Sequence, residues 1–426
     1  MIFIKKRIFY IAIIFLLVVS IICIIALRKE KKEQPPVIDP HIEVNRDLDF
    51  KLLKGVHEEY KENYLISPLS IAYALSMLKD GASDETRTQI ENVLNGYNVT
   101  KITNIPNKIS IANGLFIKNK YKNIIKEDYV KNLKNNYDAD VIYDEFTTPE
   151  VINNWVNDKT FKMIPNALQS INPEFVLALA NAIAIDVEWK SKFDCYRTLE
   201  DDFNLDDGTK MKTAMMNDDN VLYLNNQYAE GIIKDYKMYD TKTGEATYEK
   251  NDNTIELEYI AILPKTSLDD YIKIFNKEEL DNLLKTKVEP NNEREIYLSL
   301  PKYTYDFDYE TFENALQNMG ITKAFQKNAE FYNMYDKDSL DGLYVSKAIH
   351  KSHIELSENG TKAAAVTIFT MDTNAIDINE KEIIKIKFDK PFIYIIKEKN
   401  NDNIWFMGAV YEPLKWEDNK SECSYN

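Results

Sequence analysis

The sequence predicts one domain of the α+β class between residues 43 and 416. Stretches with helical periodicity and stretches with strand periodicity both occur in this part of the chain, and no internal repeat or change of composition divides it. Phe175 to Trp189 is an almost unbroken apolar run with Asn181 alone near its centre, which is typical of a strand buried on both faces of a sheet. With 44% hydrophobic residues, the chain can build a sizeable core around such a strand.

The strongest helical signal begins at Ser67, which can cap a helix, and at Pro68, which fits the first turn. Gly81 ends this helix, and a second helix begins at Ser83 and runs to Asn95. Further segments with helical periodicity are 48–59, 121–137, 151–160 and 307–319.

Strand patterns rich in β-branched and aromatic residues occur in the rest of the domain. They cover residues 109–117, 220–224, 228–236, 254–263, 294–303, 344–356, 385–397 and 404–410. The polar segment 238–253 lies between two of these strands and is predicted to be a hairpin insertion.

The N-terminal region carries a separate signal. Ile8 to Leu27 holds no charge and is long enough to cross a bilayer as a helix. Ile24-Ile25-Ala26 is a poor cleavage site, so we expect residues 1–28 to be a transmembrane anchor, an uncleaved signal, with a cleaved export signal as the alternative. Residues 29–42 then form a charged, proline-containing stalk, and residues 417–426 form a polar tail. We expect the large domain to lie outside the cytoplasm, either anchored to the membrane or secreted after cleavage.

The charge of the chain is strongly acidic. The formal net charge is −16, and residues 1–34 hold seven Lys or Arg against two Asp or Glu, so the remainder carries −21. Such a surface repels phosphate backbones and anionic lipid headgroups. We therefore expect no nucleic acid partner and no docking of the domain on anionic lipid.

Few residues offer catalytic or metal-binding chemistry. Cys195 and Cys423 are too few for a disulfide framework and are expected as separate thiols, with pairing in an oxidising compartment as the alternative. His350 and His353 lie three apart on a predicted strand, so they point to opposite faces and are not expected to share a metal. The chain has no Gly-x-Ser-x-Gly elbow, phosphate-binding glycine loop or Cys-x-x-Cys. We predict that it is not an enzyme and needs no metal or cofactor.

Residues 358–377 combine a turn with an unusual strand pattern. Asn359-Gly360 can turn, and small alanines follow where a strand in a sheet carries larger side chains. Alternate residues of an extended chain share one face, and one face of this segment stays uncharged until Asp377. The residues of that face are Thr361, Ala363, Ala365, Thr367, Phe369, Met371, Thr373 and Ala375. We predict an exposed loop that can enter a narrow gap and become a strand with one face buried.

Several motifs that follow one another through residues 45–415 resemble the serpin family. Residues 63–75 resemble the helix B signature of that family, and residues 152–157 with Thr160 resemble helix F. Further matches are Gly81-Ala82, Asn181-Ala182-Ile183 with Trp189, Leu300-Pro301-Lys302-Tyr303, Met319-Gly320-Ile321, Ala329-Glu330-Phe331, Pro391-Phe392 and Phe406-Met407-Gly408. Two positions depart from the pattern: Val187 replaces a glycine before Trp189, and a glycine after Thr160 is lost at Phe161-Lys162.

The resemblance implies a large central mixed β-sheet with additional sheets, about eight to nine helices and an exposed reactive-centre loop. It also implies an inhibitor of serine-type endopeptidases that acts as a suicide substrate, because the cleaved loop inserts into the central sheet and traps the protease covalently. Inhibition of cysteine proteases by the same route is a further expectation, and a non-inhibitory carrier or interaction protein is the alternative. We expect a monomer whose partner is the target protease.

The resemblance also implies roles for single residues. The hinge residues are Glu358, Gly360, Thr361, Ala363, Ala364, Ala365 and Thr367. Trp189 and Lys302 match the breach at the top of the sheet, and Lys302 is expected to pair with Glu358. Ser67, Ser70, Asn181 and His350 match the polar cluster under the point where the sheet opens. Counting from Glu358 places the reactive bond at Asn374–Ala375, within a window from Met371 to Ile378.

Overall fold

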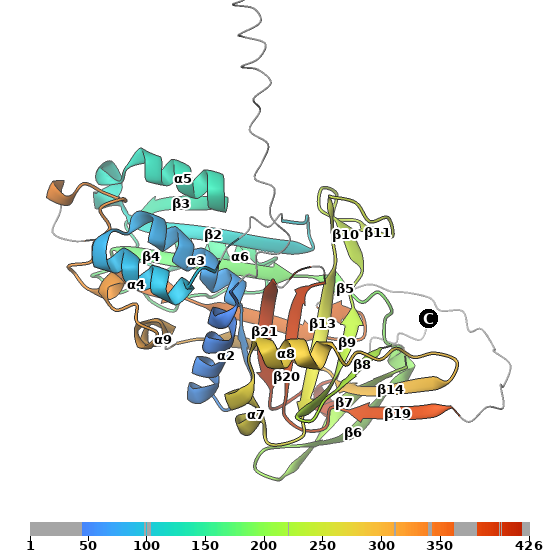
Figure 1. Cartoon of the computed structure of the whole chain (residues 1–426). Coiled ribbons are helices and arrows are strands. Elements are labelled where there is room, and N and C mark those ends of the chain that lie inside the picture. Colours follow the sequence, from blue (N-terminus) through green and yellow to red (C-terminus); the bar gives the residue numbers. More distant parts are fainter. Residues whose placement is uncertain are drawn as a thin grey trace, which may run out of the picture. The chain divides into compact units, whose positions relative to one another are not determined.

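The described residues form five β-sheets with helices around them (Figure 1), which confirms the α+β prediction. Two of the four-stranded sheets share two chain segments, 177–188 and 345–356, and we treat them as the halves of a central sheet. This computed structural model describes residues 45–97, 99, 104–219, 221–310, 312–339, 343–361, 381–399, 401 and 403–419. The predicted membrane span and stalk fall within residues 1–44, which lie outside the described residues. Among the residues that are described, no helix is long and apolar enough to cross a membrane.

One half of the central sheet has the strand order β16-β4-β2-β3, and we call it the lower half whatever its place in the view. Its strands are β2 (Ile109–Lys118), β3 (Ala139–Asp144), β4 (Leu177–Ile185) and β16 (Val345–Ile349). β4 is antiparallel to β2, whereas β16 lies parallel to β4 and β3 lies parallel to β2, so this sheet is mixed, as predicted.

The other half has the strand order β15-β17-β18-β5 and contains the start of the predicted hinge, and we call it the upper half. Its strands are β5 (Val187–Glu188), β15 (Tyr303–Asp308), β17 (Lys351–Leu356) and β18 (Gly360–Thr361). β4 continues into β5 through Asp186, and β16 continues into β17 through His350. The single strands predicted over 175–189 and 344–356 are therefore wrong in one respect: the first is interrupted at Asp186 and the second at His350.

A second sheet, with the order β1-β21-β20-β13-β9-β8, holds much of the core. Its strands are β1 (Tyr64–Ile66), β8 (Leu222–Asn225), β9 (Ala229–Asp235), β13 (Leu257–Pro264), β20 (Phe392–Glu398) and β21 (Ile404–Val410). The predicted hairpin insertion forms a small antiparallel sheet of β10 (Met238–Asp240), β11 (Ala246–Thr247) and β12 (Thr254–Ile255), with β10 in the middle.

The third sheet has the order β19-β14-β7-β6. Its strands are β6 (Thr198–Asn204), β7 (Lys210–Asp218), β14 (Arg294–Pro301) and β19 (Glu382–Lys387). The predicted strand 385–397 is wrong as one element, because β19 belongs to this sheet and β20 to the second. Pro391, which has no N–H to donate to a ladder, lies in the crossing between them.

The helices are α2 (Asp47–Glu59), α3 (Pro68–Gly81), α4 (Asp84–Leu94), α5 (Glu127–Tyr137), α6 (Glu150–Lys159), α7 (Leu268–Ile274), α8 (Lys277–Leu284) and α9 (Phe312–Asn318). Four of the six predicted helices begin and end within a residue or two of their predicted limits, whereas α7 and α8 were not predicted and the helix predicted from residue 121 begins only at Glu127. Short 3₁₀ helices cover Asn119–Ile124, Cys195–Arg197, Lys323–Phe325, Lys337–Ser339 and Trp416–Asp418. The predicted helix 307–319 is too long, because β15 extends to Asp308 and only Phe312–Asn318 is helical.

α3 is the helix that positions the candidate site. The Ser70 N–H donates to Ser67 Oγ over 3.2 Å, so Ser67 caps this helix as predicted. α3 packs against both β4 and β21, between the central and the second sheet.

The connection after α6 carries backbone strain. Phe161 and Lys162 have φ values of 52° and 67°, in the left-handed region that disfavours residues with a Cβ. These are the positions where the family glycine is lost. Hydrogen bonds hold the turn, since the Lys162 N–H donates to Asn157 O over 2.9 Å and the Met163 N–H donates to Thr160 O over 2.8 Å.

Candidate functional site

The first residues of the predicted hinge already lie inside the central sheet. Thr361 pairs with Leu356 of β17 on one side and with Val187 of β5 on the other, and Gly360 pairs with Glu188. Thr361 is only 1% exposed, and its Oγ1 lies 2.6 Å from the hydroxyl of Tyr236. β18 is therefore a two-residue strand between β17 and β5, whose continuations β16 and β4 pair directly with each other in the lower half.

Gly360 occupies a position that admits no side chain. Its φ is 155°, and a Cβ built on it would lie 2.1 Å from the carbonyl oxygen of Val187 and 2.7 Å from the Cα of Glu188. Both neighbours are backbone atoms of β5, which cannot move without breaking the ladder. Glycine is therefore required for the chain to turn into the sheet here.

The turn that precedes β18 rests on Trp189. The Ser357 N–H donates to Gly360 O over 3.0 Å and closes the turn. The indole Nε1–H of Trp189 donates to Ser357 O over 2.9 Å, and the Trp189 backbone N–H donates to Asn359 O over 3.0 Å. The buried indole stacks on Tyr236 with ring centroids 4.4 Å apart. Trp189 thus holds the turn and supports the tyrosine that contacts Thr361.

A buried ion pair lies beside this turn. Lys302 Nζ is 2.9 Å from Glu358 Oε2, and both side chains are almost fully buried. The Thr198 hydroxyl donates to the other carboxylate oxygen, Glu358 Oε1, over 2.8 Å. Removing one member of a buried pair leaves the other charge without compensation, which costs about 3–5 kcal/mol. The predicted contact between Lys302 and Glu358 is present, and the Thr198 hydroxyl occupies the carboxylate oxygen that Lys302 does not contact.

A second buried ion pair was not predicted. Lys234 on β9 forms a hydrogen-bonded ion pair with Asp218 on β7, and its ammonium lies 4.4 Å from the ring centroid of Phe193 and 5.8 Å from that of Trp189. Burial lowers the pKa of Lys234. The sequence signal was available, because a lysine directly after the apolar Ile232-Ile233 pair in a core strand needs a partner.

The predicted polar cluster lies where the two halves of the sheet meet. The Ser67 N–H donates to His350 Nε2 over 3.3 Å, and the Ser70 hydroxyl donates to Asn181 Oδ1. His350 and Asn181 directly follow Ile349 and Ala180, which form the last pair between β16 and β4. The four residues are therefore brought together at the fork of the sheet.

The cluster extends one strand farther than predicted. Asn181 pairs across the sheet with Asn113 of β2 and donates to its Oδ1, and the Asn113 amide donates to Tyr137 O over 2.8 Å. His350 is buried, and burial lowers its pKa to about 4. Its imidazole is therefore neutral near pH 7, which lets Nε2 accept the Ser67 hydrogen bond.

His350 and His353 point in different directions, as predicted. His350 faces the core, whereas His353 Nδ1 lies 2.7 Å from Asp306 Oδ1 at the surface. Within the described part of the chain, no group of three or more His, Cys, Asp or Glu could hold a metal ion. Cys195 is one half of a disulfide, so the expectation of a separate thiol is wrong for this residue, and its partner lies outside the described residues.

Other predicted positions cannot be placed. Ala363, Ala364, Ala365 and Thr367 of the hinge lie outside the described residues. So do Asn374, Ala375 and the window from Met371 to Ile378. The described chain resumes at residue 381, directly before β19.

The fold and the hinge together define a class of protein. It is an α+β domain in which Gly360 and Thr361, at the start of the predicted loop, form the short strand β18 inside the central sheet. A family model for "Serpin (serine protease inhibitor)" matches residues 43–413. The chain therefore belongs to the serpin family.

Curated relatives and solved structures cover most of the domain. Alpha-1-antitrypsin 1-2 of Mus musculus is 28% identical over 381 residues, which span 84% of this chain and 85% of the relative. Neuroserpin of Homo sapiens is 27% identical and spans 85% and 89%. The native structure of the thermophilic serpin tengpin matches with a TM-score of 0.71 at 31% identity, covering 86% of this chain and 92% of that one. Thyroxine-binding globulin in complex with thyroxine matches with a TM-score of 0.70 at 25% identity, covering 87% and 98%.

Proposed function

We propose that this serpin inhibits serine-type endopeptidases as a suicide substrate, and that it can trap cysteine proteases by the same route. The observation that carries the proposal is β18, because Gly360 and Thr361 already form a strand between β17 and β5. A loop whose first residues are seated in the sheet can continue into it after cleavage without a separate entry step.

After cleavage, the rest of the loop would insert as a strand that begins between β17 and β4. Pairing of β16 with β4 ends at Ile349↔Ala180, and no ladder pair joins β17 to β4 among the described residues. The inserting face, from Thr361 to Ala375, carries no charge, so its burial needs no ionic partner. About fifteen residues at roughly 3.3 Å each span on the order of 50 Å, which is enough to carry a bound protease across the domain.

We place the reactive bond at Asn374–Ala375, within the window from Met371 to Ile378. Cleavage before Asp377 keeps that carboxylate out of the inserted face. Neither residue of the bond is basic, which favours subtilisin-like or elastase-like serine proteases, or a cysteine protease selective for Asn, over trypsin-like enzymes.

The test is incubation of the protein with a panel of such proteases, followed by denaturing gel electrophoresis and sequencing of the released C-terminal peptide. We expect a complex that survives SDS and a peptide that begins at Ala375. Cleavage of the loop by every protease, without any complex, would reject inhibition. That outcome would favour a carrier or interaction protein, a function for which the fold of the thyroxine-bound relative is a precedent.

We also propose that residues 1–28 anchor the domain at the outer face of a membrane through an uncleaved helix, with residues 29–42 as the stalk. The support is the uncharged run from Ile8 to Leu27, which is long enough to span a bilayer. Intact mass measurement of the protein from its native membrane tests this. Retention of residues 1–28 in the carbonate-resistant membrane fraction is expected, whereas a mature N-terminus after residue 26 would favour secretion.

A further inference from the structure

One edge of the central sheet borders a groove. β15 is the outermost strand of the upper half and pairs with β17 on one side, and no described strand pairs with its other side. A groove of about 570 Å³ is lined by Tyr305 to Asp308 of β15 and Glu310 after it, and by residues 60–63 and 411–412. An unpaired strand edge presents N–H and C=O groups that can receive a further strand.

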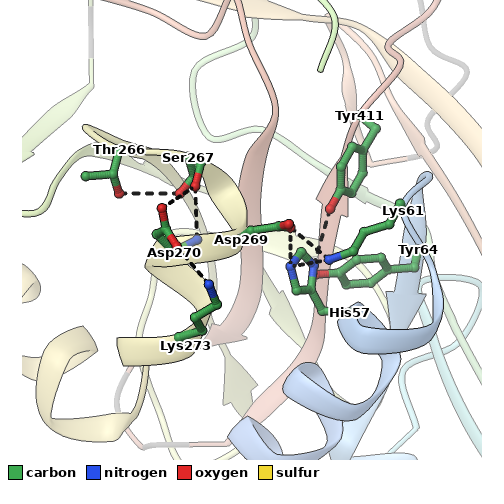
Figure 2. Close-up of polar contacts among 9 residues, drawn as sticks. All are labelled: His57, Lys61, Tyr64, Thr266, Ser267, Asp269, Asp270, Lys273 and Tyr411. Carbon is green, nitrogen blue, oxygen red and sulfur yellow. Dashed lines mark hydrogen bonds and ion pairs between the residues drawn. The ribbon is translucent and has the colours of Figure 1, made fainter. Parts of the chain in front are cut away.

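The wall opposite β15 is held in place by hydrogen bonds. Asn63 Nδ2 donates to Glu412 O over 2.6 Å, and Asn63 Oδ1 accepts from the Tyr411 and Glu412 N–H groups over 2.7 and 2.9 Å. The Tyr411 hydroxyl lies 3.3 Å from His57 Nδ1 on α2 (Figure 2). The groove is therefore formed before any partner binds.

The groove has a basic residue on its wall, but that charge is already engaged. Lys61 Nζ lies 2.8 Å from Asp269 Oδ1 and 3.1 Å from His57 Nε2, so it is turned toward α7 (Figure 2). Lys61 is the only Lys or Arg among the residues that line the described groove. Its ammonium is compensated by Asp269.

Five carboxylates line the same groove: Glu62, Asp306, Asp308, Glu310 and Glu412. Asp306 and Asp308 contact His353 and Lys351 of β17, each over 2.7 Å. The exposed carboxylates of Glu62, Glu310 and Glu412 make no hydrogen bond or ion pair with any described residue. The groove therefore attracts positive charge, and its aromatic part, where the ring of Tyr60 meets that of Phe307 edge-on at 5.1 Å, can pack against the stem of a basic side chain.

We propose that this groove docks an extended basic segment of a partner protein, which adds to β15 as a further strand. Asp306 and Asp308 lie two residues apart on one face of β15, so the added strand would carry Lys or Arg at alternate positions. An added strand of about six residues spans roughly 20 Å, which matches β15. This docking site is independent of the proposed inhibition, since it uses neither the hinge nor the reactive loop.

The probe is fluorescein-labelled acetyl-Val-Lys-Val-Lys-Val-Lys-amide, and its binding to the full chain is followed by fluorescence anisotropy. We expect saturable binding that falls about tenfold in Glu310→Lys and in Glu412→Lys, because each places a like charge in the groove. Glu289→Lys is the matched control, since Glu289 is exposed and follows Val288, which bridges to β8 at the opposite edge of the second sheet from β1. We expect the control to change affinity less than about twofold.

Two comparisons separate strand addition from attraction by net charge. The same peptide with N-methylated valines cannot donate backbone hydrogen bonds from those positions, and it should bind at least about tenfold more weakly. Equal loss of affinity in Glu289→Lys, equal binding of the N-methylated peptide, or no binding of the first peptide would each overturn the proposal.

Discussion

The two halves of the central sheet hold the same two chain segments, 177–188 and 345–356, in different ways. In the lower half, β16 lies directly beside β4, with ladder pairs from Val345↔Leu177 to Ile349↔Ala180. In the upper half, β17 and β5 are separated by β18. Direct pairing ends at Ile349 and Ala180, and β18 takes the place between the two segments farther along, beside Leu356 of β17 and Val187 of β5. The lower half is therefore held together by direct pairing of β16 with β4, and the upper half by Gly360 and Thr361, which pair with strands on both sides.

The two halves are also stabilised by different chemistry. Beside β18 lies a buried ion pair, because Lys302 contacts Glu358, whose other carboxylate oxygen accepts a hydrogen bond from Thr198. At the fork the groups are neutral, because His350 is buried with no ion-pair partner among the described residues and Asn181 accepts a hydrogen bond from Ser70. Changes in the upper half should therefore act through uncompensated charge, and changes in the lower half through lost hydrogen bonds or protonation.

The largest effect is expected at the upper half, from Thr361→Arg. Thr361 is almost completely buried against Tyr236, so seating an arginine there would bury a charge without a partner. We expect the yield of SDS-stable complex to fall by more than about tenfold while cleavage of the loop continues. Thr266→Arg, at an exposed threonine before α7, is the matched control and should leave the yield unchanged.

The ion pair between Lys302 and Glu358 can be tested by replacing one of its members and then both. Glu358→Ala should destabilise the protein by about 3–5 kcal/mol, because Lys302 remains buried without its partner. The double variant Glu358→Met/Lys302→Met should lose much less, since no charge is left in the site. Urea unfolding of both variants measures this, and a double variant that is as unstable as the single one would contradict a cost that arises from unpaired charge.

The fork in the lower half should respond to pH. Since burial lowers the pKa of His350 to about 4, the unfolded state binds the proton more readily than the folded state below pH 6.5. The contribution of His350 to stability is complete above pH 6.5 and is lost as the pH falls toward 4. Between pH 7.5 and pH 5 the loss should be about 2 kcal/mol. His350→Gln should remove most of this dependence in urea titrations at the two pH values, and a slope that persists would exclude His350 as its source.

The smallest effect is expected in the connection between α6 and β4. Lys162→Gly should stabilise the protein by about 1 kcal/mol, because glycine adopts the left-handed φ without a Cβ clash. Lys134→Gly, in the last turn of α5, is the matched control and should destabilise by up to about 1 kcal/mol. Thermal unfolding should show shifts of opposite sign, and a loss of stability in Lys162→Gly would contradict strain at this turn.

Much of the candidate site was predictable because each residue breaks a local pattern. Asn181 is a polar residue in an apolar run, and Ser67-Pro68 is a helix start, so both are visible without an alignment. Asn113 carries the same signal in the strand Ile111-Ala112-Asn113 but was not singled out, although it accepts the hydrogen bond from Asn181.

The division of the central sheet could not be predicted. Periodicity along one strand reports which face is buried, but it does not report where two strands distant in sequence separate. Asp186 separates β4 from β5 and His350 separates β16 from β17, and both interruptions are visible only in the pairing of the strands in the structure. The strands β6 and β7 were missed for a related reason, because their charged residues, such as Asp202 and Lys212, pair with each other across the ladder at 2.6 Å.

The central claim, that β18 is the start of a strand completed after cleavage, is tested most directly by the melting temperature of the protein before and after the loop is cut. Full insertion buries the remaining side chains of the uncharged face, about seven in number beyond Thr361, so we expect the melting temperature to rise by roughly 10 °C or more. The rise should be absent in Thr361→Arg. An unchanged or lower melting temperature after complete cleavage of the protein would contradict the account.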